Sequence, residues 1–281
     1  MPPMNDAVEE GSMENAGKSR VNLARKRSKT HGCAKHGANC RHGANGHAHG
    51  ASAAVEGVLT ESGIKTENHG IVVHVESLDH FHRAARLTEA KGLIWARGAA
   101  DAGVQRAMES WVRDQAEPEQ DFAHESVRID RIDPSALWKA CKRLSASLPG
   151  QFRDVIERDA RLCAEVMLAH ASGDDEKAMT FAVEIVERNA CARWHQDNYV
   201  GRVIITYTGS GTWMVDDESV RFDQFEPTVG ASINESDARI VPDFHSIHVA
   251  PLNAISLMKG ERWPGIRGNG LTHKVRIARS P

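Results

Sequence analysis

The chain has 281 residues, 41% of them hydrophobic and 26% charged, with a formal net charge of −3. This length fits one large domain or two small ones, and the charge is not that of a dedicated nucleic-acid-binding domain. No apolar stretch would serve as a signal-peptide core or a transmembrane helix, and five irregularly spaced cysteines predict no disulfide framework. We therefore expect a cytoplasmic protein with no membrane and no specific nucleic acid as partner. The sequence does not specify the oligomeric state.

Residues 1–66 form the first compositional unit. The first 55 residues contain no Phe, Tyr, Trp or Ile, and Leu23 is their only leucine, so this segment is predicted to be a disordered tail. Up to residue 50 the tail holds eight Lys or Arg against four acids, which makes it basic. Residues 31–49 also hold five of the fifteen histidines and two of the five cysteines. Glycines separate these side chains, so any metal bound here would be held by an adaptable arm rather than by a structural finger.

From residue 67 the sequence is that of a globular domain, and its first half is mainly helical. Val104, Met108, Trp111 and Val112 recur at three-to-four spacing, which is typical of an amphipathic helix. Asp133 followed by Pro134 marks a helix start, because Asp caps the free amides and Pro suits the first helical position. We predict strands at 71–75 and 93–96, and helices at 78–88, 100–116, 133–148 and 150–171.

After about residue 178 short strands separated by Gly, Pro and Asn turns predominate. Phe181, Val183 and Ile185 alternate with less apolar residues, as in a strand with one wet face. Further strands are predicted at 191–197, 202–208, 212–215, 238–241, 245–249, 254–258 and 271–277. The predicted fold class is α+β. A helical N-terminal half is followed by a double-stranded β-helix, a cupin-like jelly roll, within a single domain spanning 67–281.

The most specific chemical signal is the pair His195-X-Asp197. Side chains two apart on a strand point to the same face, so both can bind one metal ion. His273, on a late β-branched strand, is the best candidate for a third ligand. Two histidines and one carboxylate with open positions are typical of non-heme Fe(II) sites. The alternative is an ordinary His–carboxylate hydrogen bond in a core.

Other residues extend or compete with this site. His245 or His248 could replace His273 as the third ligand. Arg202 and Arg276 lie seven and three residues beyond His195 and His273, and either could bind the carboxylate of an organic acid co-substrate. Arg202 is therefore a candidate for both catalysis and co-substrate binding, Arg276 for co-substrate binding, and Tyr207 for catalysis as a cavity-lining residue.

Several ordered motifs give the chain a family resemblance. They are Ile94-Trp-Ala-Arg97, Cys191-Ala-Arg-Trp-His-Gln-Asp-Asn198, Thr206-Tyr-Thr-Gly-Ser-Gly-Thr-Trp213, Leu257-Met-Lys-Gly-Glu261, Trp263-Pro-Gly265 and Gly270-Leu-Thr-His273. Over residues 70–281 the chain resembles the bacterial family known as domain of unknown function 1826. Through its His-X-Asp and distal His it is also similar to cupin-like oxygenases that depend on Fe(II) and 2-oxoglutarate.

This resemblance implies Fe(II) at His195, Asp197 and His273, an oxygenase reaction on an unidentified substrate, and 2-oxoglutarate as a candidate co-substrate. Family members are also associated with zinc limitation, so the resemblance equally admits zinc and a zinc-binding or zinc-homeostasis protein without oxidative activity. A non-catalytic barrel is the third reading. Two departures weigh against 2-oxoglutarate: only eight residues follow His273, whereas such oxygenases place the anchoring Arg or Lys later, and Lys274-Val275 stand where the family has Arg and Ser.

Overall fold

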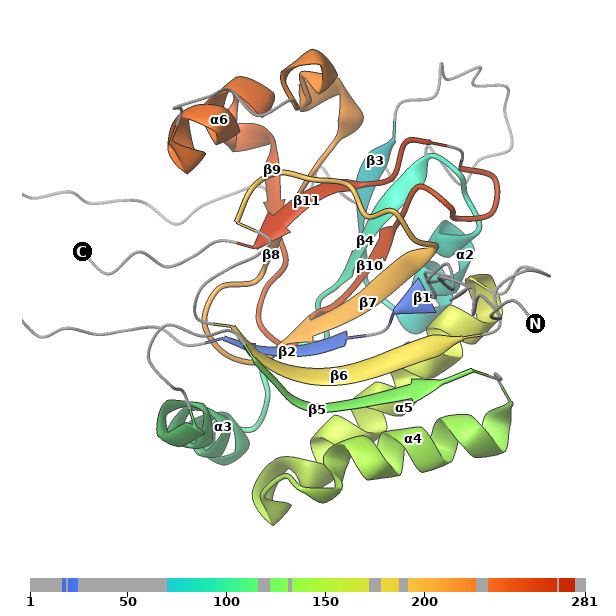
Figure 1. Cartoon of the computed structure of the whole chain (residues 1–281), viewed down its shortest axis with the longest axis vertical. Helices are drawn as coiled ribbons and strands as arrows, with labels where there is room; N and C mark the ends of the chain where they lie inside the picture. Colours follow the sequence, from blue (N-terminus) through green and yellow to red (C-terminus); the bar gives the residue numbers. More distant parts are fainter. Residues whose placement is uncertain are drawn as a thin grey trace, which may run out of the picture.

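The structure is a computed structural model of the whole chain. It describes residues 17–18, 20–24, 70–115, 122–130, 133–171, 178–186, 192–225, 232–266 and 268–275. The helices are α2 (Leu78–Ala85), α3 (Ala102–Gln115), α4 (Pro134–Ala146), α5 (Gly150–His170) and α6 (Ile233–Ile240) (Figure 1). The strands are β1 (Gly17–Lys18), β2 (Arg20–Ala24), β3 (Ile71–Val75), β4 (Ala90–Trp95), β5 (Phe122–Ile129), β6 (Met179–Val186), β7 (Gly201–Thr206), β8 (Thr212–Val215), β9 (Ile247–Val249), β10 (Ile255–Lys259) and β11 (Thr272–Val275). Short 3-10 turns lie at Asp217–Ser219 (η1), Phe222–Gln224 (η2) and Phe244–Ser246 (η3).

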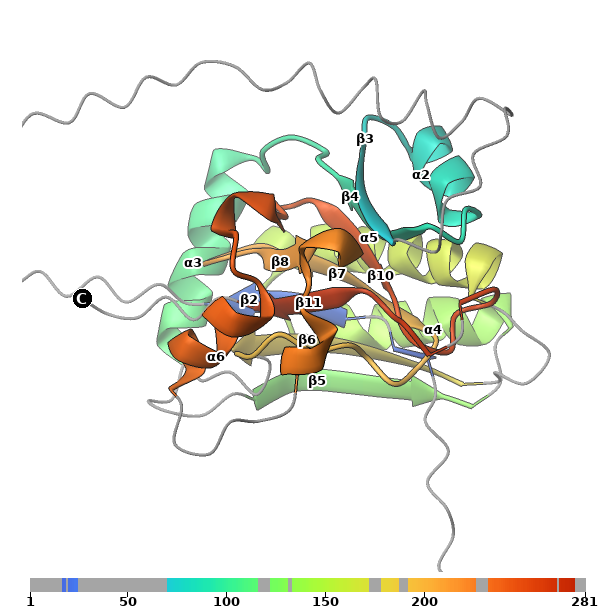
Figure 2. The same cartoon turned by 90° about the horizontal axis from the view of Figure 1, so that it is seen from above.

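The strands form two sheets. The large sheet has the order β1-β6-β2-β7-β10-β4-β3, with β5 also paired to β6, and it mixes parallel and antiparallel neighbours. The small sheet is antiparallel, in the order β11-β8-β9. Helices α4 and α5 lie on one side of the large sheet and the small sheet lies on the other, with α6 beyond it (Figures 1 and 2).

Side chains alternate between two cores along the strands of the large sheet. Val203 and Ile205 of β7 join the main core against the helices, whereas Ile204 joins a smaller core between the sheets. Met214 of β8 and Leu271, just before β11, complete this smaller core from the other side. The even-numbered residues of β7, such as Ile204, therefore face the small sheet. A third cluster, which includes Ile240 of α6, covers the outer face of the small sheet.

Most of the predicted elements are present. All four predicted helices form, and α4 begins where expected, with Asp133 accepting a hydrogen bond from the Ala136 amide. Two predicted strands are wrong. Residues 233–240 form α6, because Ser232 and Glu235 make a capping box that starts a helix. Residues 192–200 form no extended strand, and within them only His195 makes an isolated bridge. Strand β5 was not predicted.

Part of the N-terminal tail is paired with the large sheet. Two short pieces of the predicted disordered tail pair with the large sheet as β1 and β2, through backbone hydrogen bonds to β6 and β7. The remainder of residues 1–69, with the His/Cys-rich segment 31–49, lies outside the described residues. Within the described residues the two sheets form no closed barrel, so the double-stranded β-helix stays a prediction. Among these residues no helix is both long and apolar enough to cross a membrane.

Candidate metal centre

The two candidate histidine ligands lie side by side on paired backbone segments. His195 and His273 face each other in an antiparallel bridge and exchange both backbone hydrogen bonds, with N–O distances of 3.1 and 3.0 Å. Directly opposed residues of an antiparallel pair project from the same face. Their imidazole rings are accordingly neighbours, with centroids 4.4 Å apart. One strand pairing thus joins two residues that are 78 positions apart.

Asp197 completes the cluster because it lies two residues beyond His195. Its Oδ1 is 3.7 Å from His195 Nε2, and its Oδ2 is 3.4 Å from His273 Nε2. One ligand atom from each of the three residues lies within 4.8 Å of the others, and the described residues contain no second group of this kind. The Asp197 carbonyl accepts a hydrogen bond from the Glu261 amide, which fixes the backbone on the far side of the carboxylate. The three residues predicted as ligands are therefore brought together.

Backbone carbonyls set the tautomers of both histidines. His195 Nδ1 lies 2.9 Å from the Arg193 carbonyl, and His273 Nδ1 lies 3.0 Å from the Leu271 carbonyl. A carbonyl only accepts, so each Nδ1 carries the proton and each neutral ring presents an Nε2 lone pair. Burial lowers the pKa of His273 to about 3, and the nearby Asp197 opposes this shift only in part, so His273 is neutral at pH 7. Hydrogen-bonding the second nitrogen to a carbonyl is how proteins orient histidine ligands of metals.

The arrangement fits a bound cation. His273 Nε2 is buried without a hydrogen-bond partner, and it lies 3.4 Å from Asp197 Oδ2, whose charge is met on its other side by Arg202 Nε at 2.7 Å. Two lone pairs facing each other in a buried site repel, and a metal ion between them would turn that repulsion into coordination. Two imidazole nitrogens and one carboxylate oxygen suit Fe(II) with open positions, and they also suit zinc. His195 is the most accessible ligand, with 31% of its side chain exposed, so the cluster is open to solvent from its side.

Comparison with protein families gives a match over residues 82–281 to the family described as protein of unknown function DUF1826. The chain belongs to this family. The matched region contains all three members of the His/Asp cluster. Comparison with curated proteins and with solved structures gave no match.

In this DUF1826 chain Arg202 forms an ion pair with Asp197. Its Nη2 donates to Asp197 Oδ1 at 2.8 Å, and its Nε lies 2.7 Å from Asp197 Oδ2 as an ion-pair contact. Only 7% of the Arg202 side chain is exposed, and its guanidinium packs over the Tyr199 ring at 4.8 Å. Arg202 therefore lies beside the His/Asp cluster, but its guanidinium contacts Asp197 and is not presented to a co-substrate.

Tyr207 lies away from the cluster. Its hydroxyl donates to Asp159 of α5 at 2.7 Å, and Arg97 holds the same carboxylate through two hydrogen bonds of 2.7 and 2.9 Å. Tyr207 is 1% exposed and belongs to the helix-side core, on the opposite face of the large sheet from Arg202 and Asp197. Burial and Asp159 raise the pKa of Tyr207 well above its usual value, so it stays protonated. The expectation that Tyr207 lines the metal cavity is therefore not met, because β7 directs it to the other side.

The remaining site predictions have mixed outcomes. Arg276 lies outside the described residues. His248 does not join the cluster: its ring lies 3.2 Å from His74 and 3.3 Å from Asp216, so it serves a separate contact between β9 and β3. His245 is exposed in η3.

From the sequence, Lys274, which follows His273, is only a departure from the family pattern and not a predicted site residue. Lys274 forms a buried ion pair with Asp237 of α6 and lies between the rings of Trp194 and Trp213, about 5 Å from each centroid. The sequence signal for this contact is a lysine directly after His273, together with Trp194 directly before His195 and Trp213 in the strand that pairs with β11.

Proposed function

We propose that the chain is a mononuclear Fe(II) protein that oxidises an organic substrate with O2. The observation that carries this proposal is the convergence of His195, Asp197 and His273 on one point, with His273 Nε2 buried and without a hydrogen-bond partner, in a family-matched domain. Bound Fe(II) would supply a site where O2 and a co-substrate meet. The chain's own residues would hold the metal from one side, with both imidazoles neutral and Asp197 fixed by Arg202.

The strand order supports the double-stranded β-helix that this function implies. From residue 179 the chain enters the large sheet as β6, reaches the small sheet at His195, and returns to the large sheet as β7. It then places β8 and β9 in the small sheet, β10 in the large sheet and β11 in the small sheet. Alternation between two facing sheets is the winding of a double-sheet jelly roll. His273 lies on β11 and His195 bridges to it, and His273 has the parity of Leu271, which packs toward the large sheet.

We further propose a 2-oxo acid as co-substrate, with 2-oxoglutarate the first to test. In the overall reaction one O2, one 2-oxoglutarate and one C–H bond of the substrate would give succinate, CO2 and the hydroxylated substrate, with one oxygen atom entering succinate and the other the new hydroxyl group. Arg202 is not the anchor for this acid in the described structure, since Asp197 occupies its guanidinium. A zinc-binding protein without turnover is the second candidate. The pairing of Arg202 with Asp197 makes Arg202 unavailable to anchor an acid, and the donor set also suits zinc.

Metal content and turnover of the untagged full-length chain test the proposal. We expect one Fe(II) per chain that His195→Ala loses, and succinate release from 2-oxoglutarate and O2 that the same variant abolishes. His245→Ala is the matched control, because His245 is an exposed histidine outside the cluster. The difference between the two variants isolates the cluster from any metal held by the His/Cys-rich tail. One zinc ion lost in His195→Ala, without turnover under Fe(II), would favour the second candidate. Equal metal content in both variants would refute a metal site here.

A further inference from the structure

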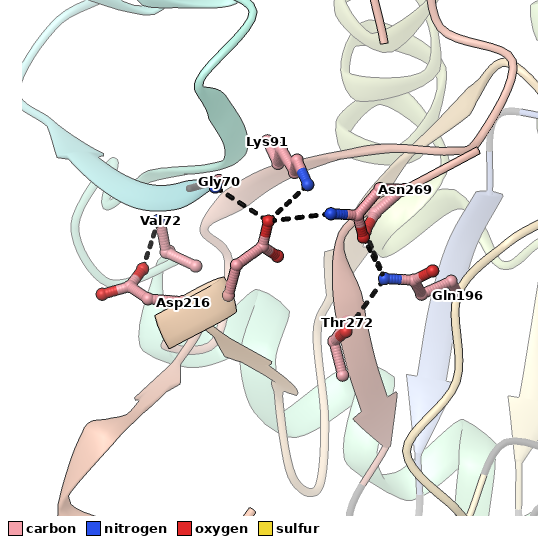
Figure 3. A network of polar contacts seen from close by, with 9 residues as sticks. Gly70, Val72, Lys91, Gln196, Asp216, Asn269 and Thr272 are labelled. Atoms are coloured by element: carbon pink, nitrogen blue, oxygen red, sulfur yellow. Dashed lines mark hydrogen bonds and ion pairs between the residues drawn. The ribbon is translucent and has the colours of Figure 1, made fainter. Parts of the chain in front are cut away.

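Gln196 lies between His195 and Asp197. It anchors residues 192–200, which we call the metal segment, to the strand that carries His273. Its side-chain amide nitrogen donates to Asn269 Oδ1 at 2.8 Å, to the Gly270 carbonyl at 2.7 Å and, more weakly, to Thr272 Oγ1 at 3.2 Å (Figure 3). The Gly270 carbonyl only accepts, so the nitrogen of the amide must face it. All three partners lie within four residues of His273.

The contacts continue from Asn269 to a buried ion pair. Asn269 Nδ2 donates to Asp217 Oδ2 at 3.2 Å, and the same oxygen accepts from Lys91 Nζ and from the Gly70 amide (Figure 3). Asp217 and Lys91 are 4% and 5% exposed, so their charges neutralise each other away from water. We call Gln196, Asn269, Asp217 and Lys91 the anchoring network. It connects the metal segment, the loop before β11, η1 and β4.

The backbone of the metal segment has little regular β-pairing: besides the His195 bridge, backbone hydrogen bonds from the turn after β10 reach the carbonyls of Asp197, Tyr199 and Val200, all of them beyond Gln196. Between residues 192 and 200 only His195 forms a β-bridge, while a neighbouring strand would hold every second residue. The angle between His195 and Asp197 therefore depends on the peptide units around Gln196. The side chains of His195 and Asp197 lie together in the cluster, whereas the Gln196 amide lies against Asn269, Gly270 and Thr272.

We propose that Gln196 is a positioning residue that sets the ligand geometry of the metal centre through the anchoring network. This inference rests on the proposed metal site. Partners that orient metal ligands without touching the metal typically contribute 10- to 100-fold to metal affinity. Gln196 does not contact the ligand atoms, so its effect reaches the metal only through the positions of His195 and Asp197.

Co(II) is the probe, because its visible absorption reports ligand geometry as well as binding. We expect Gln196→Met, which keeps the side-chain length and removes the hydrogen bonds, to bind Co(II) at least tenfold more weakly. We also expect its Co(II) absorption bands to shift at saturation. Gln105→Met is the matched control, since Gln105 also donates its amide to a backbone carbonyl, that of Tyr207 at 2.7 Å, outside the cluster. The control should lose stability in denaturant without changing affinity or spectrum.

Asn269→Ala provides a second, milder variant that carries the test if Gln196→Met does not fold. It removes one acceptor of Gln196 and the link to Asp217, and we expect weaker Co(II) binding with a shifted spectrum. Wild-type affinity and an unchanged spectrum in a folded variant would overturn the role of Gln196 and leave the metal site standing. If His195→Ala instead binds Co(II) as tightly as the wild-type chain does, the proposed function itself is overturned.

Discussion

Arg202 offers a direct test of whether Asp197 is placed to hold a cation. Arg202→Met removes a guanidinium that lies 2.8 and 2.7 Å from the two Asp197 oxygens, while both side chains are less than a tenth exposed. Removing one partner of a buried ion pair costs about 3–5 kcal/mol, because the other charge is left uncompensated. Methionine retains part of the apolar packing of the arginine stem, so we expect the metal-free variant to lose about 3 kcal/mol of unfolding free energy.

A bound divalent ion should restore most of this loss. In the wild-type protein Arg202 already neutralises Asp197, whereas in the variant the metal is the nearest counter-charge. Two unit charges 4 Å apart attract by about 4 kcal/mol at the effective dielectric of a partly buried site. We therefore expect saturating Zn²⁺ to raise the unfolding free energy of Arg202→Met by about 2 kcal/mol more than that of the wild type. Denaturant unfolding with and without metal measures both values.

The control is Arg128→Met, which breaks an Arg–Asp pair whose side chains are 49% and 79% exposed. An exposed pair contributes about 0–1 kcal/mol, so this variant should be nearly neutral and should gain no extra stabilisation from metal. Equal stabilisation of Arg202→Met and wild type by saturating Zn²⁺ would refute the reasoning, since Asp197 would then not be a ligand. A near-neutral Arg202→Met in metal-free protein would refute the buried-pair premise.

Three further predictions concern the rest of the molecule. Tyr207→Phe removes a buried hydroxyl that donates to Asp159, so thermal or denaturant unfolding should show a loss of about 1–3 kcal/mol with Co(II) affinity unchanged. Burial and the adjacent His82 lower the pKa of His170 to about 4, while an unfolded histidine titrates near 6.5. The unfolded chain thus binds more protons between these values, and stability should fall as the pH drops from 6.5 to 4. The partial exposure of the ring limits the loss to about 1 kcal/mol, and His170→Asn should remove that share of the pH dependence. Gly211→Ala should destabilise the fold by about 2 kcal/mol or more in urea, because a Cβ there would lie 1.8 Å from the Ala250 carbonyl oxygen.

The helices and the ligand residues were predictable because their signals are local or strongly constrained. Asp133-Pro134 specifies the start of α4 by capping chemistry alone, and the spacing of Val104, Met108 and Val112 specifies α3. His195 and Asp197 were paired by the two-residue period of extended chain. That inference survives although the segment is not a regular strand, because side-chain alternation needs only extended backbone.

The errors arise where a local pattern competes with a nearby signal or with distant partners. Ala238 to Val241 resembles a strand, yet Ser232 and Glu235 start a helix six residues earlier, and that capping box is visible in the sequence. Strand β5 pairs only with β6, so few of its residues need to be apolar and its pattern is weak. Tyr207 is five residues beyond Arg202, so the alternation of strand side chains already places the two on opposite faces, and the predicted shared cavity overlooks this parity.

The candidate ligands and the residues that hold their backbone lie on opposite faces of the small sheet. His195 and His273 face the large sheet, whereas their immediate neighbours Trp194 and Lys274 meet on the outer face. There Asp237 of α6 pairs with Lys274, so the helix holds the segments that carry His195 and His273 without contacting the atoms of the His/Asp cluster. The residue after the distal histidine is then constrained by the charge of Asp237 and by two indole rings. This explains why Lys274 can stand at this position, since any cation long enough to reach Asp237 between the rings would meet the same requirement.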